Sequence, residues 1–161
     1  MAGLHPQACR MGLIIRPFET SDRAAISSLL ADSAAFSDEE VRVALEMLDS
    51  GDYTVFALEM NGAVSGYACI GRTPLTLTTW HLYWICVHSR VQHRGAGRAL
   101  QQHVEEFIRS QKGERLVLET SGRPDYERTR RFYDRAGYQQ AGRIRDYYKP
   151  DDDCVFYFKV L

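Results

Sequence analysis

The sequence lacks the features that mark disulfide-stabilised proteins. Its 161 residues include four cysteines, and no two of them form a C-x-x-C pair. Cys69 and Cys86 lie inside apolar, strand-like runs, and Cys9 and Cys154 are far from both in the chain. We therefore expect buried free thiols in a reducing cytoplasm rather than a framework of disulfides.

The sequence also lacks long apolar runs and an excess of charge of one sign. No run approaches the length of a membrane span, and the N-terminus lacks the apolar core of a signal peptide. Twenty Lys and Arg residues nearly balance 21 Asp and Glu residues, for a net charge of −1. This balance argues against a general nucleic-acid-binding protein. The sequence predicts a cytoplasmic protein with neither membrane nor nucleic acid among its partners.

The chain carries no internal repeat, low-complexity segment or long linker. Its length suffices for one domain with a sizeable core. We interpret residues 1–11 as a disordered leader and residues 12–161 as a single domain.

Apolar periodicity and turn residues predict an ordered series of strands and helices. Strands are expected at residues 12–16, 53–60, 63–72, 77–87, 115–120, 138–148 and 154–160, and helices near residues 23–34, 38–50, 96–108 and 128–136. Ser37 is a favourable N-cap for the second helix, and Asn61-Gly62 is a strong hairpin signal. The order predicts an α+β, three-layer fold: a mixed, mainly antiparallel sheet of six or seven strands with helices on both faces.

The most informative stretch joins the apolar run 82–87 to the helix that begins near residue 96. A loop ending in Gly95-Ala96-Gly97 leads into that helix, and glycine permits both positive φ and close approach of a ligand. A helix N-terminus favours anions, so the loop is a candidate diphosphate site. The alternative is an ordinary turn with a solvated basic face. The basic side chains are Arg90, His93, Arg94 and Arg98.

Two familiar phosphate motifs do not fit this loop. The P-loop pattern is absent, and Leu100 stands where a dinucleotide fingerprint needs its third glycine. The pattern Gln92-x-x-Gly95-x-Gly97 instead resembles the acetyl-CoA pyrophosphate loop of the GNAT superfamily of N-acetyltransferases, written [Q/R]-x-x-G-x-[G/A]. The predicted element order is also similar to the GNAT fold from about residue 12 to the C-terminus.

This resemblance implies a cofactor site for acetyl-CoA. It implies that one backbone segment pairs with the pantetheine arm as an added strand would, and that one N–H of this segment polarises the thioester carbonyl. The backbone segment is Ile85, Cys86 and Val87, and the loop residues are Gln92, His93, Arg94, Gly95, Ala96, Gly97 and Arg98.

A second resemblance covers residues 129–138, which are similar to the family's late helix, written A-x-x-x-Y-x-x-x-G-[F/Y]. Tyr133 holds the position of the tyrosine that in many members protonates the departing thiolate of coenzyme A. A phenol can donate such a proton. The alternative is that Tyr133 packs beside Phe132 as an ordinary helix aromatic.

The acceptor amine needs a base, because an amine with a pKa of about 10 is protonated at neutral pH. Glu119 ends an apolar strand and matches the proton acceptor of some relatives, notably the ribosomal-protein-alanine acetyltransferases. The spacing to Tyr133 is longer here because Gly122-Arg123-Pro124 intervenes. His81 is the other candidate base, water a third, and a strand-end glutamate paired with an arginine is the structural alternative.

The remaining candidates suggest no further chemistry. Cys86 lacks a Cys-His-Asn pattern, and 151–153 is interpreted as a solvated acidic turn, so no metal is expected. The resemblance implies that the acceptor rests against the first two helices and the last hairpin. An acidic rim there would suit a cationic amine, although such a run is usually a solvated face. The rim residues are Asp38, Glu39, Glu40, Glu46 and the Asp151 run.

The sequence therefore predicts an acetyl-CoA-dependent N-acetyltransferase. The acetyl group would pass to a primary amine, small molecule or peptide, by direct attack in a ternary complex, and a homodimer is compatible with this interpretation. The alternatives are a non-catalytic acyl-CoA sensor module and a nucleotide-binding regulatory domain.

Overall fold

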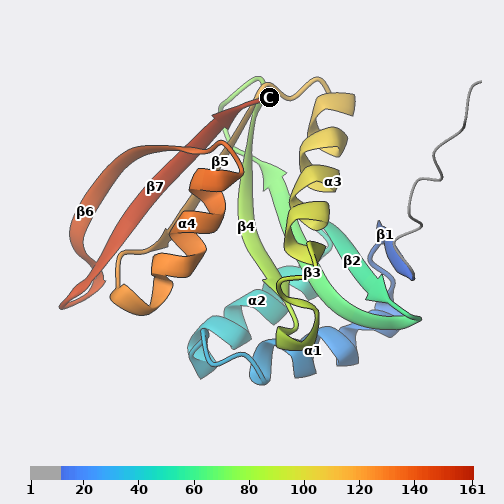
Figure 1. Cartoon of the computed structure of the whole chain (residues 1–161). Helices are drawn as coiled ribbons and strands as arrows, with labels where there is room; N and C mark the ends of the chain where they lie inside the picture. The colour runs from blue at the N-terminus through green and yellow to red at the C-terminus, as the bar shows by residue number, and fades with distance from the viewer. Residues whose placement is uncertain (1–11) are drawn as a thin grey trace, which may run out of the picture.

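The computed structural model describes residues 12–161 (Figure 1). Residues 1–11, interpreted above as a leader, lie outside the described residues together with Cys9. The strands are β1 (Leu13–Pro17), β2 (Thr54–Met60), β3 (Ala63–Arg72), β4 (Thr79–Val87), β5 (Arg115–Ser121), β6 (Gln139–Lys149) and β7 (Asp152–Val160). The helices are α1 (Arg23–Ala31), α2 (Asp38–Ser50), α3 (Ala96–Ser110) and α4 (Glu127–Arg135), with 3-10 turns η1 (Thr20–Asp22), η2 (Ser89–Val91) and η3 (Pro124–Tyr126).

All seven strands form one sheet in the order β1-β2-β3-β4-β5-β7-β6. Only the β4–β5 pair is parallel among these strands, so the sheet is mixed and mainly antiparallel, as predicted. The β2–β3 hairpin turns at Asn61 (φ 53°) and Gly62 (φ 80°), which is the left-handed geometry that a two-residue hairpin requires.

Helices cover both faces of the sheet, which confirms the three-layer arrangement (Figure 1). Side chains alternate along β3, so Ala68 and Ile70 face α3 while Tyr67 and Cys69 face α1 and α2. Two buried clusters result, one on each face. The first includes the stripe Leu100, Val104 and Ile108 of α3 together with Tyr133 of α4.

Local signals set most of the helix ends. The Ser37 hydroxyl accepts a hydrogen bond from the Glu40 amide, and the Glu40 side chain accepts one from the Ser37 amide, which completes a capping box. The first helix, however, ends at Ala31 and not near Ala34. The Ser33 hydroxyl accepts a bond from the Ala35 amide at 3.3 Å, a local turn that competes with helix.

The fourth strand is also shorter than predicted. It begins at Thr79, whereas Leu77 lies in the preceding loop and is 90% exposed. The thiols follow the prediction within the described residues, because Cys69, Cys86 and Cys154 are all free and buried.

Candidate active site

The parallel pairing of β4 with β5 stops part-way along both strands. The ladder joins 79–82 to 115–118, while β4 continues to Val87 and β5 to Ser121. Beyond this point β4 stays paired with β3 and β5 with β7, so the two strands diverge (Figure 1). Within residues 12–161, the second edge of β4 has no registered strand partner after Leu82.

This free edge includes Ile85, Cys86 and Val87, the backbone segment that the GNAT resemblance expects to pair with pantetheine. Their other edge pairs with β3, Ile85 opposite Ala68 and Val87 opposite Gly66, which fixes the segment as extended backbone. An exposed strand edge is a ready partner for another extended chain.

Helix α3 starts where β4 ends and presents its N-terminus without a side-chain cap. Gly95 is the N-cap residue with φ 78°, and no side-chain hydrogen bond caps it. The first-turn amides therefore remain available to an anion. The Gln92 side chain instead turns back, donating to the Val87 carbonyl at 3.0 Å, which ties the loop to the end of β4.

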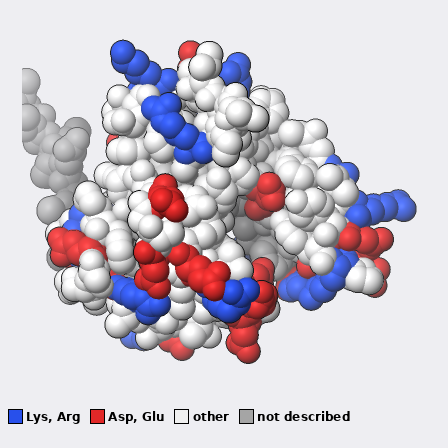
Figure 2. Space-filling model, turned by 180° about the vertical axis from the view of Figure 1, so that it is seen from behind, with Lys and Arg blue, Asp and Glu red and all other residues white. Residues whose placement is uncertain are grey.

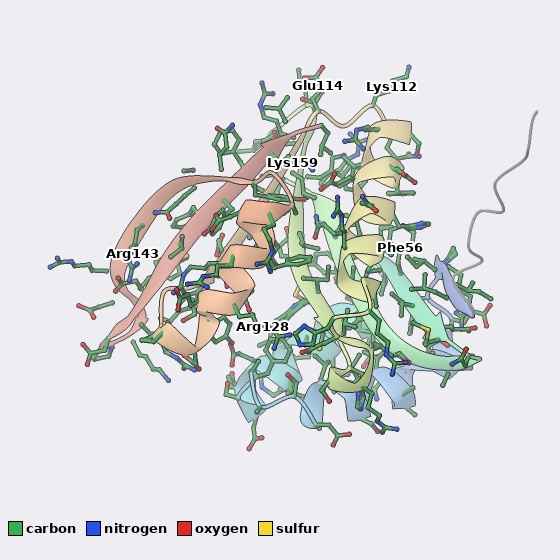
Figure 3. The ribbon with its side chains drawn as sticks, viewed as in Figure 1. Phe56, Lys112, Glu114, Arg128, Arg143 and Lys159 are labelled. Atoms are coloured by element: carbon green, nitrogen blue, oxygen red, sulfur yellow. The ribbon has the colours of Figure 1, made fainter. Side chains whose placement is uncertain are left out.

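The basic side chains of the loop are exposed, as an anion site requires. They are Arg90, His93, Arg94 and Arg98. Arg128, from the start of α4, joins them: its guanidinium contacts the His93 ring and lies 3.2 Å from Nδ1 (Figure 3). The sequence patterns did not single out Arg128, because nothing local indicates that α4 begins beside this loop.

Gly97 lies in the first turn of α3 against α4 and the end of β4. A Cβ at Gly97 would meet Phe132 at 3.7 Å and Val87 at 3.9 Å, which are ordinary contact distances. The fold itself therefore accepts a small side chain at Gly97.

Tyr133 projects from α4 into the core on the α3 side of the sheet. It is 5% exposed, and its ring lies between 5.4 and 5.8 Å from the rings of Phe132, Tyr138 and Tyr157. Burial raises the pKa of Tyr133 far above its ordinary value, so the phenol keeps its proton at neutral pH. The Tyr133 ring thus packs in the core as an ordinary helix aromatic would, and its hydroxyl still carries a proton.

A buried polar network fixes the end of α4 against α3 and β7. Lys159 donates to Glu105 at 2.8 Å and to the Ala136 carbonyl at 2.8 Å (Figure 3). Tyr138 donates to the same carboxylate at 2.9 Å and accepts from Gln101. Ala136 directly follows α4, so this network restrains the helix that carries Tyr133.

His81 of β4 and Glu119 of β5 meet on the opposite face of the sheet. His81 Nε2 lies 3.8 Å from Glu119 Oε1, and their side chains are 19% and 33% exposed. Burial lowers the pKa of His81, and the Glu119 charge opposes this shift only partly. His81 stacks on Tyr83 with a 4.4 Å separation between ring centroids, which holds the imidazole parallel to the tyrosine ring.

A groove of about 710 Å³ runs along this face beside the pair, over β4, β5, β6 and β7. The molecule is visibly hollowed on this side, between its main body and the β6–β7 arm (Figure 2). His81 and Glu119 both line the groove. Tyr133 and Glu119 therefore lie on opposite faces of the sheet, beside the divergence of β4 and β5.

The Cys86 thiol points away from the free edge of β4. It belongs to the cluster beneath α1 and α2, and burial raises its pKa to about 11. A protonated, buried thiol is a poor nucleophile. At the free edge of β4, Cys86 therefore presents its backbone and not its thiol.

Part of the acidic rim expected from sequence is paired with arginines. Arg42 pairs with both Glu39 and Glu46, while Glu40 is used in the capping box. In the last hairpin, Arg143 pairs with Asp153 at 2.6 Å. Within residues 12–161, no group of three or more His, Cys, Asp or Glu side chains is placed to hold a metal ion.

Comparison with known proteins agrees with this geometry. Residues 22–138 match the acetyltransferase (GNAT) family. The chain belongs to the GNAT family. A solved structure from Desulfovibrio desulfuricans, assigned to the same family, shares 33% identity and superposes with a TM-score of 0.88. That match covers 92% of this chain and 99% of the other, so the GNAT fold extends over most of the chain.

More distant solved structures share the GNAT fold. The ribosomal-protein-S18-alanine N-acetyltransferase of Escherichia coli has a TM-score of 0.76 at 23% identity, covering 92% of this chain and 93% of its own. YncA of Salmonella typhimurium, solved with acetyl-CoA, has a TM-score of 0.73 at 21% identity, covering 93% and 94%. No curated protein sequence matches the chain. In the described part of the chain, no helix combines the length and apolarity needed to cross a membrane.

Proposed function

We propose that this GNAT protein transfers the acetyl group of acetyl-CoA to a primary amine by direct attack in a ternary complex. The observation that carries the proposal is the free edge of β4. At one end of this edge lies the uncapped start of α3. The His81–Glu119 pair lies near its other end, on the face of the sheet opposite α3.

Acetyl-CoA would supply an activated thioester, and the residues present fit its parts. The amides of Ala96, Gly97 and Arg98 open α3 without a side-chain cap, which suits a diphosphate. Arg94 and Arg128 add positive charge beside it. The free backbone groups of 85–87 suit the amide-bearing pantetheine arm, and one N–H there would polarise the thioester carbonyl.

The far side of the site would prepare the amine. Glu119 is our candidate for the group that removes the ammonium proton, directly or through water, so that the neutral nitrogen can attack. His81 Nε2 lies 3.8 Å from the Glu119 carboxylate and is the second candidate to accept this proton. Its lowered pKa keeps the imidazole neutral and able to accept at pH 7.

Tyr133 would return a proton on the other face of the sheet. Its raised pKa keeps the hydroxyl protonated at neutral pH, so it has a proton to donate when the thiolate departs. The network around Glu105 and Lys159 would hold α4 so that this hydroxyl keeps its place. The net change would be one amide formed, one thiol released and one proton passed to solvent.

The proposal is tested by incubating the protein with acetyl-CoA and a panel of amines. Free thiol is measured by a colorimetric reagent and acetylated product by mass spectrometry. We expect one thiol released for each amine acetylated. Tight binding of acetyl-CoA with no thiol release for any amine class would instead indicate an acyl-CoA sensor.

A further inference from the structure

The groove beside His81 and Glu119 indicates which amines the protein would accept. We infer that the acceptor is a primary monoamine on an apolar body, bound with its ammonium at Glu119 and its body along β5 and β7. This inference rests on the proposed function and specifies its second substrate.

The size of the groove suits a small molecule. Its volume of about 710 Å³ lies within the range of about 300–1,000 Å³ typical of ligand pockets. The groove is formed by four strands of one sheet, so the pairing register of the strands determines which side chains lie next to each other on its floor. Val117 lies opposite Phe158, and Glu119 lies opposite Phe156.

The floor of the groove is apolar. Val117, Phe156 and Phe158 point onto this face from β5 and β7, and Ile144 of β6, 49% exposed, borders it. No helix packs on these side chains in the described part of the chain, so they remain only partly buried. An apolar ligand that covers them would remove apolar surface from water, which favours binding.

The charges of the groove distinguish one amine class from another. Of the side chains that line it within residues 12–161, Glu119 is the one carboxylate, whereas Arg115 and Arg143 are cations. Asp153 already pairs with Arg143 at 2.6 Å. The acid nearest to Arg115 is Glu114, 3.8 Å away. One ammonium therefore has a partner in the groove, and a second would face Arg115.

The spacing along β5 sets the length at which this second charge matters. Arg115 and Glu119 lie on the same face of the strand, and four residues of extended chain span about 13 Å. A six-carbon amine bound at Glu119 would lay its chain over Val117 and point its far end toward Arg115. A diamine of that length would bring its second ammonium to the arginine end.

The decisive comparison uses n-hexylamine and hexane-1,6-diamine, which differ by that second ammonium. We expect kcat/KM for n-hexylamine to exceed that for the diamine by about tenfold or more, the scale of a pocket mismatch. Calorimetric titration of both amines into the protein with coenzyme A present should also show that n-hexylamine binds more tightly than the diamine. Equal values, or a preference for the diamine, would overturn the inference.

Charge reversal at Arg115 supplies a matched pair of variants. Arg115→Glu places a carboxylate at the far end, on a side chain that is 51% exposed, and should raise kcat/KM for the diamine several-fold relative to kcat/KM for n-hexylamine. Lys112→Glu makes the same charge change outside the groove lining, at the turn after α3, and should leave this ratio unchanged (Figure 3). Equal responses of the two variants would contradict the inference.

A second copy of the chain or a peptide could occupy the groove instead. Sedimentation of the wild type and of Ile144→Asp tests the first of these. If the wild type is a dimer, the variant is a monomer and the amine preference is unchanged, the groove is a protein interface and the inference is overturned. Efficient acetylation of peptide N-termini but not of n-hexylamine would also overturn it, while leaving acetyl transfer intact. Failure to bind acetyl-CoA at all would remove the proposed function and the inference together.

Discussion

Glu119 Oε1 lies 3.8 Å from His81 Nε2, across the point where the β4–β5 ladder ends. The contact joins two groups whose protonation is linked. Burial lowers the pKa of His81, and the Glu119 carboxylate raises it in part. Removing the carboxylate charge should therefore lower the pKa of His81 further.

This linkage gives a pH prediction. If Glu119 accepts the amine proton, Glu119→Gln should reduce turnover most at low pH, where the amine is protonated, and raising the pH should partly restore it. His81→Gln should have the smaller effect. The measurement is kcat/KM against pH for the two variants and the wild type.

The same pH profiles would also show whether His81, and not Glu119, is the base. If His81 is the base, activity is lost as the pH falls through its pKa, which lies below its usual value of 6.5. Glu119→Gln would then move that acid limb to lower pH, and His81→Gln would abolish activity. Near wild-type profiles in both variants would leave water as the proton acceptor.

The helix start is tested at Gly97. Gly97→Val should weaken acetyl-CoA binding strongly, because a bulky side chain in the first turn of α3 would crowd a diphosphate bound at that helix start. The fold should persist, since a Cβ there meets nothing closer than 3.7 Å. Gly97→Ala is the matched control and should bind nearly as wild type. Binding is measured by calorimetry and folding by circular dichroism. A folded Gly97→Val that binds with wild-type affinity would refute the loop assignment.

Tyr133→Phe keeps the ring in the core and removes the proton. We expect turnover to fall by about 10²-fold, the scale of lost acid–base help, with little change in acetyl-CoA affinity. Tyr138→Phe serves as the contrast, because its hydroxyl donates to Glu105 and should affect stability more than turnover. Unchanged turnover in Tyr133→Phe, with chemistry limiting the rate, would exclude the acid role.

The network behind α4 predicts a stability effect. Lys159→Met leaves Glu105, 5% exposed, without its closest cation, and should lower the free energy of unfolding by about 2 kcal/mol or more. Arg131→Met breaks an exposed ion pair with Glu127 and should cost less than about 1 kcal/mol. Urea unfolding measures both. Equal small losses would show that the network does not stabilise the fold.

The sequence predicted the fold well where the controlling signals are local. The Asn61-Gly62 turn and the Ser37 cap depend on residues a few positions apart, and both formed as expected. The same holds for the glycine-led start of α3. The predicted end of α1 was wrong. The hydrophobic spacing continues to Ala34, but the Ser33 hydroxyl accepts a hydrogen bond from the Ala35 amide and forms a local turn instead.

The site was predictable only in part. Patterns along the chain selected Glu119, His81 and the loop, and the structure places the first two together. The contact of Arg128 with His93 and the pairing of the acidic rim by Arg42 depend on tertiary placement or rotamers, which no spacing reveals. The apolar groove was missed for the same reason, because four strands from distant segments form it.

A crystal structure of the complex with coenzyme A tests the central claim most directly. The account predicts the diphosphate at the amides of 96–98 and the pantetheine arm paired with the backbone of 85–87. It also predicts the sulfur within hydrogen-bonding reach of the Tyr133 hydroxyl. Coenzyme A bound elsewhere, or with its sulfur remote from both Tyr133 and the His81–Glu119 pair, would contradict it.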